Sequence, residues 1–138
     1  MNSIIRNYSR FLDNHNVRYD TINDNALNIR YSLEKYSNAT LNIIVSCSSD
    51  DYVYIMVLGL GTLSKISNSI YETINNINEN KRWGRLYIDD KQKIVMDFNF
   101  FIPENNINEF IHRYISTSVL VGQEYYPLIQ KMIWGDNN

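Results

Sequence analysis

The sequence has one cysteine, two histidines, two prolines and five glycines in 138 residues. The lone Cys47 excludes an intramolecular disulfide and any metal site built from several cysteines. His15 and His112 are far apart, and neither has a second histidine or a cysteine at helical spacing, so no metal site is expected. No proline- and glycine-rich stretch divides the chain, which predicts a single domain over residues 1–138.

The chain also lacks a long hydrophobic run. A membrane helix needs about 18 consecutive apolar residues, and no segment comes near that length. Arg6, Arg10 and Asp13 interrupt the N-terminal segment, which therefore lacks the continuous apolar core of a signal peptide. We expect a cytoplasmic protein that does not act on a membrane.

An excess of positive charge is missing as well, because the formal net charge is -2 at pH 7. Nucleic-acid binding needs a concentrated basic face. The closest basic group is Lys81, Arg82 and Arg85, and Trp83 and Gly84 interrupt it. A solvated helix end explains this group better than a phosphate site does, so no nucleic-acid partner is expected.

Apolar and aromatic residues are plentiful, at 44% and 13% of the chain, and eleven residues are tyrosines. The apolar content is ordinary for a folded domain and argues against disorder. Tyrosine is suited to half-buried sheet surfaces and to interfaces, because its ring packs while its hydroxyl stays in contact with water.

Hydrophobic periodicity predicts the order helix, three or four strands, helix, two strands, helix. The predicted elements are a helix over 2–15, a short segment at 18–22, strands over 26–35, 40–48 and 52–60, a helix over 64–81, a hairpin of 84–90 and 93–101, and a last helix that opens at Pro103 and Glu104. Gly122 and Pro127 predict a break in that helix. The fold class is α+β: a mainly antiparallel sheet of about five strands, with helices at the N-terminus, in the middle and at the C-terminus.

The strand predicted at 52–60 is apolar on both sides, and its partner at 93–101 carries further apolar residues. Such a strand is either covered on both sides by helices or leaves one apolar side exposed as an interface. The pattern does not decide between these two alternatives. The candidate partner-binding residues are Tyr52, Tyr54, Ile55, Met56, Phe98 and Phe100.

The remaining reactive groups fit structural roles. Cys47 falls on the apolar side of a strand, where cysteine acts as a small hydrophobic residue. The acidic pairs 50–51 and 89–90 lie at predicted turns, where aspartate binds nearby backbone groups. The Gly59-Leu60-Gly61 segment precedes a helix but lacks the lysine of a phosphate-binding loop. No catalytic residue and no cofactor are predicted.

The segment from Ile70 to Gly135 resembles a known family. It contains "IYETINNINENKRWGRLYIDD", then "KIVMDFNFFIP", then "EYYPLIQKMIWG". These stretches look like the packing and turn motifs of the bacterial YbjN-like family, which is similar in fold to type III secretion chaperones. The resemblance implies a small α+β domain that binds an extended protein segment, often as a dimer, and some family members are described as regulators of sensory transduction. It supplies no ligand-binding residues.

These observations predict a non-enzymatic protein-interaction module, chaperone- or adaptor-like, that binds an unknown partner protein or a second copy of itself through an apolar sheet surface. The alternative is a small-ligand binder or an enzyme with an unrecognised pocket. Its sign would be a cleft that brings His112, Glu124 and Asp97 together.

Overall fold

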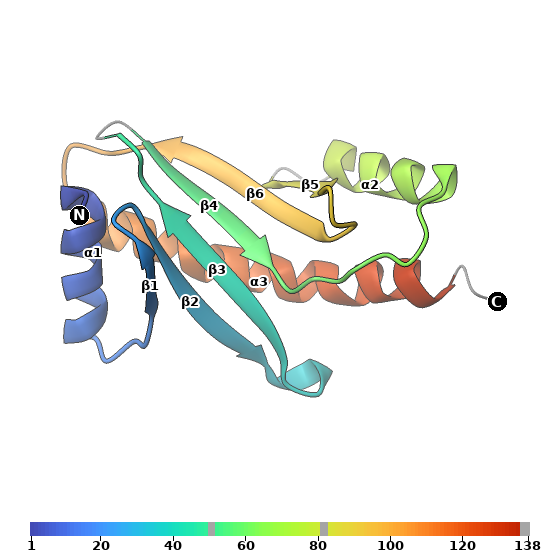
Figure 1. Ribbon diagram of the computed structural model, residues 1–138, viewed down its shortest axis with the longest axis horizontal. Coiled ribbons are helices and arrows are strands. Elements are labelled where there is room, and N and C mark those ends of the chain that lie inside the picture. The colour runs from blue at the N-terminus through green and yellow to red at the C-terminus, as the bar shows by residue number, and fades with distance from the viewer. Residues whose placement is uncertain (50–51, 81–82, 136–138) are drawn as a thin grey trace.

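The computed structural model describes residues 1–49, 52–80 and 83–135 (Figure 1). The elements are α1 (Ser3–Asn14), β1 (Asp20–Asn23), β2 (Ala26–Leu33), the short 3-10 helix η1 (Glu34–Tyr36), β3 (Ala39–Ser46), β4 (Tyr52–Leu58), α2 (Asn68–Asn80), β5 (Arg85–Ile88), β6 (Ile94–Phe101) and α3 (Ile107–Gly135). The six strands form one antiparallel sheet in the order β1-β2-β3-β4-β6-β5. The predicted α+β class and element order are confirmed, with six strands where about five were expected.

The helices bury their apolar residues against one face of the sheet, called here the covered face. Figure 1 shows α3 running behind the strands, with α1 and α2 near opposite ends of it. Side chains alternate between faces along a strand, and those that share one core cluster with the helices are Leu27, Ile29, Leu33, Leu41, Ile43, Val45, Val53, Ile55, Val57, Leu86, Ile94 and Met96. The opposite side is called the open face. The helices therefore do not wrap both faces.

α1 begins where its sequence supplies a cap. The side-chain oxygen of Asn2 accepts hydrogen bonds from the backbone amides of Ile4 (2.9 Å) and Ile5 (3.2 Å). This satisfies two of the amides that a helix start leaves without partners. Tyr8 and Leu12 continue the apolar stripe and are fully buried, so α1 is held to the covered face.

α2 begins at Asn68, four residues later than predicted. The carbonyl oxygen of Ser67 accepts hydrogen bonds from the amides of Ile70 and Tyr71, which places the helix start after Ser67. At its other end Asn78 binds the edge strand β5: its side chain donates to the Leu86 carbonyl (3.0 Å) and accepts from the Leu86 amide (2.8 Å). An amide side chain thereby satisfies backbone groups that a neighbouring strand would otherwise bind.

α3 differs from its prediction at two points. It begins at Ile107 and not at Pro103, and it continues without a break through Gly122 and Pro127 to Gly135. Pro127 lies on the exposed side of the helix, where water can solvate the carbonyl that loses its hydrogen bond. Gly122 faces the sheet, and a Cβ there would lie 2.8 Å from Leu41 Cδ1, so this glycine permits close packing and does not end the helix.

The structure describes two of the predicted turns, at Asp89 and at Gly59. The Asp89 carboxylate accepts hydrogen bonds from the amides of Lys91 (2.9 Å) and Lys93 (2.8 Å), as a turn aspartate does. Gly59 adopts φ +95°, and a Cβ there would lie 2.3 Å from the Thr40 backbone oxygen, so only glycine fits this turn. The predicted turn at residues 50–51 and the basic residues 81–82 lie outside the described residues. In the described part of the chain, no helix has the length and apolar character that crossing a membrane requires.

Candidate functional site

The open face has two halves of different character. On β1, β2 and the start of β3 it carries polar side chains, such as Asn28, Arg30 and Asn42. Beyond them lies the aromatic half, which consists of Ile44, Tyr52, Tyr54, Met56, Leu58, Tyr87, Val95 and Phe101 around the pair Arg85 and Asp97. Tyr52 is 39% exposed and Phe101 is 82% exposed. Most of the others are half-buried by their neighbours on the same face.

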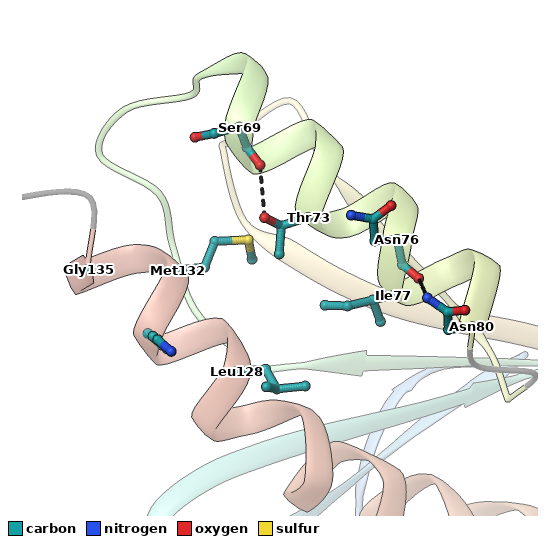
Figure 2. A pocket seen from close by; sticks show the side chains of 9 residues that line it. Ser69, Thr73, Asn76, Ile77, Asn80, Leu128, Met132 and Gly135 are labelled. Carbon is teal, nitrogen blue, oxygen red and sulfur yellow. Dashed lines mark hydrogen bonds between the residues drawn. The ribbon is translucent and has the colours of Figure 1, made fainter.

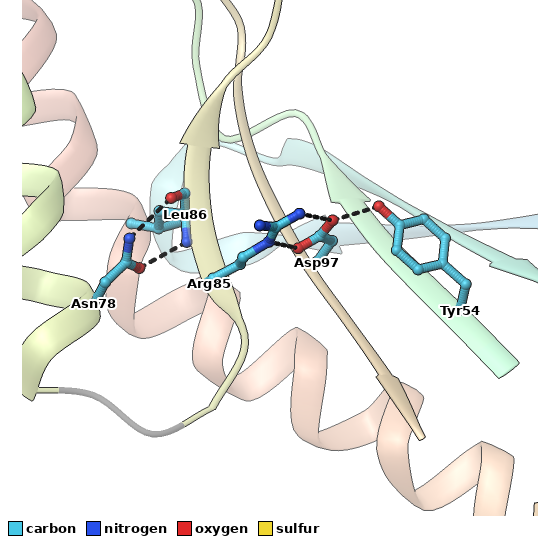
Figure 3. A network of polar contacts seen from close by, with 5 residues as sticks. All are labelled: Tyr54, Asn78, Arg85, Leu86 and Asp97. Atoms are coloured by element: carbon cyan, nitrogen blue, oxygen red, sulfur yellow. Dashed lines mark hydrogen bonds and ion pairs between the residues drawn. The ribbon is translucent and has the colours of Figure 1, made fainter. Parts of the chain in front are cut away.

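A buried carboxylate lies at the centre of the aromatic half. Asp97 is 3% exposed and forms an ion pair with Arg85, whose Nε lies 2.8 Å from Oδ1 and whose Nη2 lies 3.4 Å from Oδ2 (Figure 3). The Tyr54 hydroxyl donates to the same Oδ2. These contacts come from three neighbouring strands, because Asp97 is paired with Met56 on one side and with Arg85 on the other.

Two groups of the network, Tyr54 and Arg85, have raised pKa values. Burial, followed by the hydrogen bond to Asp97, raises the pKa of Tyr54 well above its ordinary value, so Tyr54 remains a donor. The hydrogen bond to Asp97 also raises the pKa of Arg85. Asp97 therefore has its charge balanced by Arg85, and the network holds the guanidinium in place over the Tyr87 ring, 5.3 Å from its centroid. It supplies a fixed cation, Arg85, and a fixed phenol, Tyr54.

The predicted partner-binding residues are divided between the two faces. Tyr52, Tyr54 and Met56 lie on the open face, as an interface requires. Ile55 is fully buried on the covered face, so its choice as a contact residue is corrected: a partner docked on the sheet cannot reach it.

Phe98 and Phe100 also lie on the covered side, paired with Ile55 and Val53. They stack on α3: the ring centroids of Phe100 and Tyr114 are 4.0 Å apart, and those of Phe98 and Tyr114 are 5.8 Å apart. The two phenylalanines therefore attach α3 to β6 and do not extend the open face.

Sequence reasoning missed Arg85 and Tyr87 as members of the site. A signal was present: Asp97 is the one charged residue in the stretch 94–101, whose other residues are apolar or aromatic except for Asn99. The hairpin pairing places Arg85 directly opposite it. A charged side chain in a strand that is predicted to be buried needs an oppositely charged partner. A search for that partner of Asp97 would have identified Arg85.

The alternative cleft of His112, Glu124 and Asp97 is not formed. His112 and Glu124 are twelve residues apart on α3, or about 18 Å along a helix axis, and Asp97 points to the open face on the other side of the sheet. His112 instead lies 2.9 Å from the Tyr8 hydroxyl through Nδ1, and burial lowers its pKa.

The other reactive groups have structural surroundings. Cys47 is 1% exposed, and its Sγ lies 2.6 Å from the Ser49 backbone oxygen and 3.2 Å from that of Tyr52, so its single proton can be donated to either. These surroundings are those of a core cysteine. His15 caps the end of α1 through a contact of 2.8 Å between its Nδ1 and the Phe11 carbonyl oxygen. Within residues 1–49, 52–80 and 83–135, no three histidine, cysteine, aspartate or glutamate side chains are placed to hold a metal ion together.

The sequence matches no family model and no curated protein. Among solved structures it matches a chain in the heterodimeric complex ExoU-SpcU from the type III secretion system of Pseudomonas aeruginosa. The match covers 86% of this chain and 94% of that chain, with a TM-score of 0.54 and 14% sequence identity. The likeness is one of fold. It confirms the predicted similarity in architecture to a type III secretion protein, whereas membership of the YbjN-like family stays a prediction.

Proposed function

We propose that this chain is a non-enzymatic protein-interaction module, chaperone- or adaptor-like, that binds a partner protein through the aromatic half of the open face. The observation that carries the proposal is the contrast on that face: no described helix covers it, yet it bears tyrosine, methionine and isoleucine side chains around a fixed arginine. Exposed apolar patches of this kind mark interaction sites.

The composition of the patch fits an interface better than a core. Tyrosine, methionine and arginine are enriched where proteins meet, and tyrosine and arginine often dominate the binding energy. Arg85 is especially suited, because Asp97 holds its guanidinium in one orientation before any partner arrives. A partner then avoids part of the entropy cost of ordering a long side chain.

A solved structure of similar fold is that of a heterodimeric complex, which supports a protein as the occupant. A second copy of this chain is the other candidate occupant. The YbjN-like assignment, a role as a regulator and a cytoplasmic location belong to the same proposal. The dispersal of His112, Glu124 and Asp97 supports the non-enzymatic part of it.

Site-specific photo-crosslinking tests the proposal with a matched pair of tyrosines. A benzoylphenylalanine placed at Tyr87, on the open face, is expected to form a discrete protein adduct in cells of the protein's own host. The same residue placed at Tyr71, which is 54% exposed on α2, is expected to form none. Mass spectrometry of the adduct shows whether the occupant is a second copy or another protein.

A charge introduced into the patch supplies the second test. Met56→Glu should abolish the adduct at position 87 in a protein that remains folded, because Met56 is not in the covered core. Its unfolding midpoint should fall, since the new carboxylate stands opposite Asp97. The proposal is wrong if neither site gives an adduct, if both give the same adducts, or if Met56→Glu leaves the adduct unchanged. Sedimentation of the pure protein at tens of micromolar separates a homodimer from a monomer that awaits another partner.

A further inference from the structure

A groove of about 590 Å³ lies between α2 and the C-terminal part of α3 (Figure 2). α2 and α3 each contribute one stripe of residues at helical spacing. The lining residues are Ser69, Thr73, Asn76, Ile77 and Asn80 from α2, and Leu128, Lys131, Met132 and Gly135 from α3. The groove is separate from the aromatic half of the open face and shares no residue with it.

Three of the lining side chains are large and apolar. Ile77, Leu128 and Met132 point into the space between the two helices in Figure 2. Leu128 remains 44% exposed, and Ile77 is the apolar residue of α2 across the groove from it. A ligand that covered this leucine would remove apolar surface from water on both sides of the groove, which is favourable in proportion to the area.

Two of the polar side chains that α2 contributes to the groove form hydrogen bonds within α2 itself. The Thr73 hydroxyl donates to the Ser69 carbonyl oxygen (2.9 Å), and the Asn80 amide donates to the Asn76 carbonyl oxygen (2.9 Å). These groups do not require a polar ligand along the length of the groove. An alkyl or aromatic chain can therefore lie there without leaving buried donors unpaired.

The charge of the groove has one sign. Lys131 is the only charged residue among those that line it. An adjoining depression shares Ser69 and Met132 with the groove and adds a second cation, Lys65. Among the described residues that line these two spaces there is no aspartate or glutamate. The C-terminal end of α3 carries the negative end of the helix dipole, so an anion is favoured at the two lysine ammonium groups and not at the helix end itself.

The size of the groove selects the class of occupant. Stable protein interfaces take about 20–30 residues from each partner, whereas nine residues line this groove. Its volume falls within the range of about 300–1,000 Å³ that is typical of small-molecule sites. We propose that the groove binds a small amphipathic anion, with an apolar chain against Ile77, Leu128 and Met132 and a carboxylate at Lys131. This proposal does not rest on the proposed protein-binding function.

Decanoate, below its micellar concentration, is the probe. Calorimetry and amide NMR of the full chain should show saturable binding of one molecule, with signals of Asn76 and Leu128 moving. Leu128→Gln should weaken binding about tenfold or more, the loss expected for removing one apolar side chain from a contact. The matched control is Leu120→Gln, because Leu120 is 66% exposed on the same helix outside the groove; it should bind decanoate as the parent does.

The head group is tested separately. Lys131→Gln should weaken decanoate binding about tenfold, as expected for one charge-assisted hydrogen bond, and should leave binding of the uncharged alcohol decanol unchanged. Lys91→Gln is the control for a lost lysine elsewhere. The proposal is overturned by an absence of saturable binding, by equal effects of the changes at Leu120 and Leu128, or by equal affinity for decanoate and decyltrimethylammonium.

Discussion

The two faces of this sheet are both apolar along β4, yet they are built from different kinds of residue. The covered face is aliphatic: Val53, Ile55 and Val57 are fully buried beneath α3 and its neighbours. The open face presents Tyr54 and Met56 between the same residues, with an ion pair next to them. Branched aliphatic side chains fill a closed interior, whereas tyrosine and methionine tolerate a surface that is sometimes wet and sometimes covered.

This difference indicates that one side of β4 contributes mainly to stability and the other side mainly to binding. Changes to the covered face remove packing that nothing else supplies. Changes to the open face affect a surface that is already partly solvated, so their main consequence should be for binding. The predictions below test this division, in order of decreasing effect.

The largest effect is expected at Ile55. Ile55→Ala should lower the free energy of unfolding by about 3 kcal/mol, because it deletes buried methyl groups and leaves a cavity. Its neighbour Met56→Ala should cost about 1 kcal/mol or less, since Met56 is only half-buried on the open face. Urea denaturation of the two variants measures the contrast. Equal losses would show that the open face is also a core.

The next effect compares an ion pair in each half of the open face. Arg85→Ala leaves the buried Asp97 carboxylate with only the Tyr54 donor and should cost about 2 kcal/mol, less than a fully buried pair because Arg85 faces solvent. Arg30→Ala removes the exposed pair with Asp20, at 3.3 Å in the polar half, and should cost about 0.5 kcal/mol or less. Denaturation midpoints compare the two. A similar small cost for both would mean that Asp97 is well solvated.

Tyr54→Phe should have a smaller effect than Arg85→Ala. It removes one hydrogen bond to a carboxylate that keeps its arginine, so about 1 kcal/mol of stability should be lost. Tyr52→Phe, on the same strand and face, should be nearly neutral, because no hydrogen bond of its hydroxyl is found in the described part of the chain. Thermal unfolding of both variants distinguishes them, and a neutral Tyr54→Phe would remove the hydroxyl from the network.

The smallest effect is a pH dependence of the covered side. Burial, and secondly His15, lower the pKa of His112 in the folded state below its unfolded value near 6.5. At a pH between the folded-state and unfolded-state pKa of His112, the unfolded chain therefore binds more protons than the folded chain. The contribution of neutral His112 is therefore fully present above about pH 6.5 and is lost as the pH falls through the lowered pKa. Stability measured from pH 7.5 to 5 should fall less in His112→Gln than in the parent; parallel curves would contradict this.

The sequence was sufficient for the element order because its strands alternate clearly and its hairpins have short turns. It also indicated that the strand predicted at 52–60, which is β4 (Tyr52–Leu58) in the structure, is unusual in being apolar on both sides. It could not decide which side of that strand is covered, since Ile55 and Met56 are equally apolar in a pattern. That choice depends on where α3 lies. The pattern predicted a break in α3 at Gly122, whereas in the structure the absence of a side chain at Gly122 leaves room for Leu41 to pack against the helix.

The sequence pattern also could not predict where α3 begins or that Arg85 would contact Asp97, because both depend on backbone geometry that the order of apolar and polar residues does not specify. Pro103 is a good first residue for a helix, but the chain begins its helix only at Ile107, after Asn106 with φ +56°. The ion pair forms only if Arg85 lies opposite Asp97 in the β5–β6 hairpin. The turn residues alone do not determine the register of the two strands to within one residue.

The buried carboxylate has a consequence for how the chain selects one alignment of its strands. Because β4 is apolar on both sides, a shift of β6 by one residue would find apolar side chains of β4 on either face and would meet little resistance from β4. The same shift would turn Asp97 toward the aliphatic interior, away from Arg85 and Tyr54, and an unpaired carboxylate there costs several kcal/mol. Asp97 thus penalises the misaligned sheet more than it stabilises the correct one, and it helps to ensure that the chain folds to a single pairing of β4, β6 and β5.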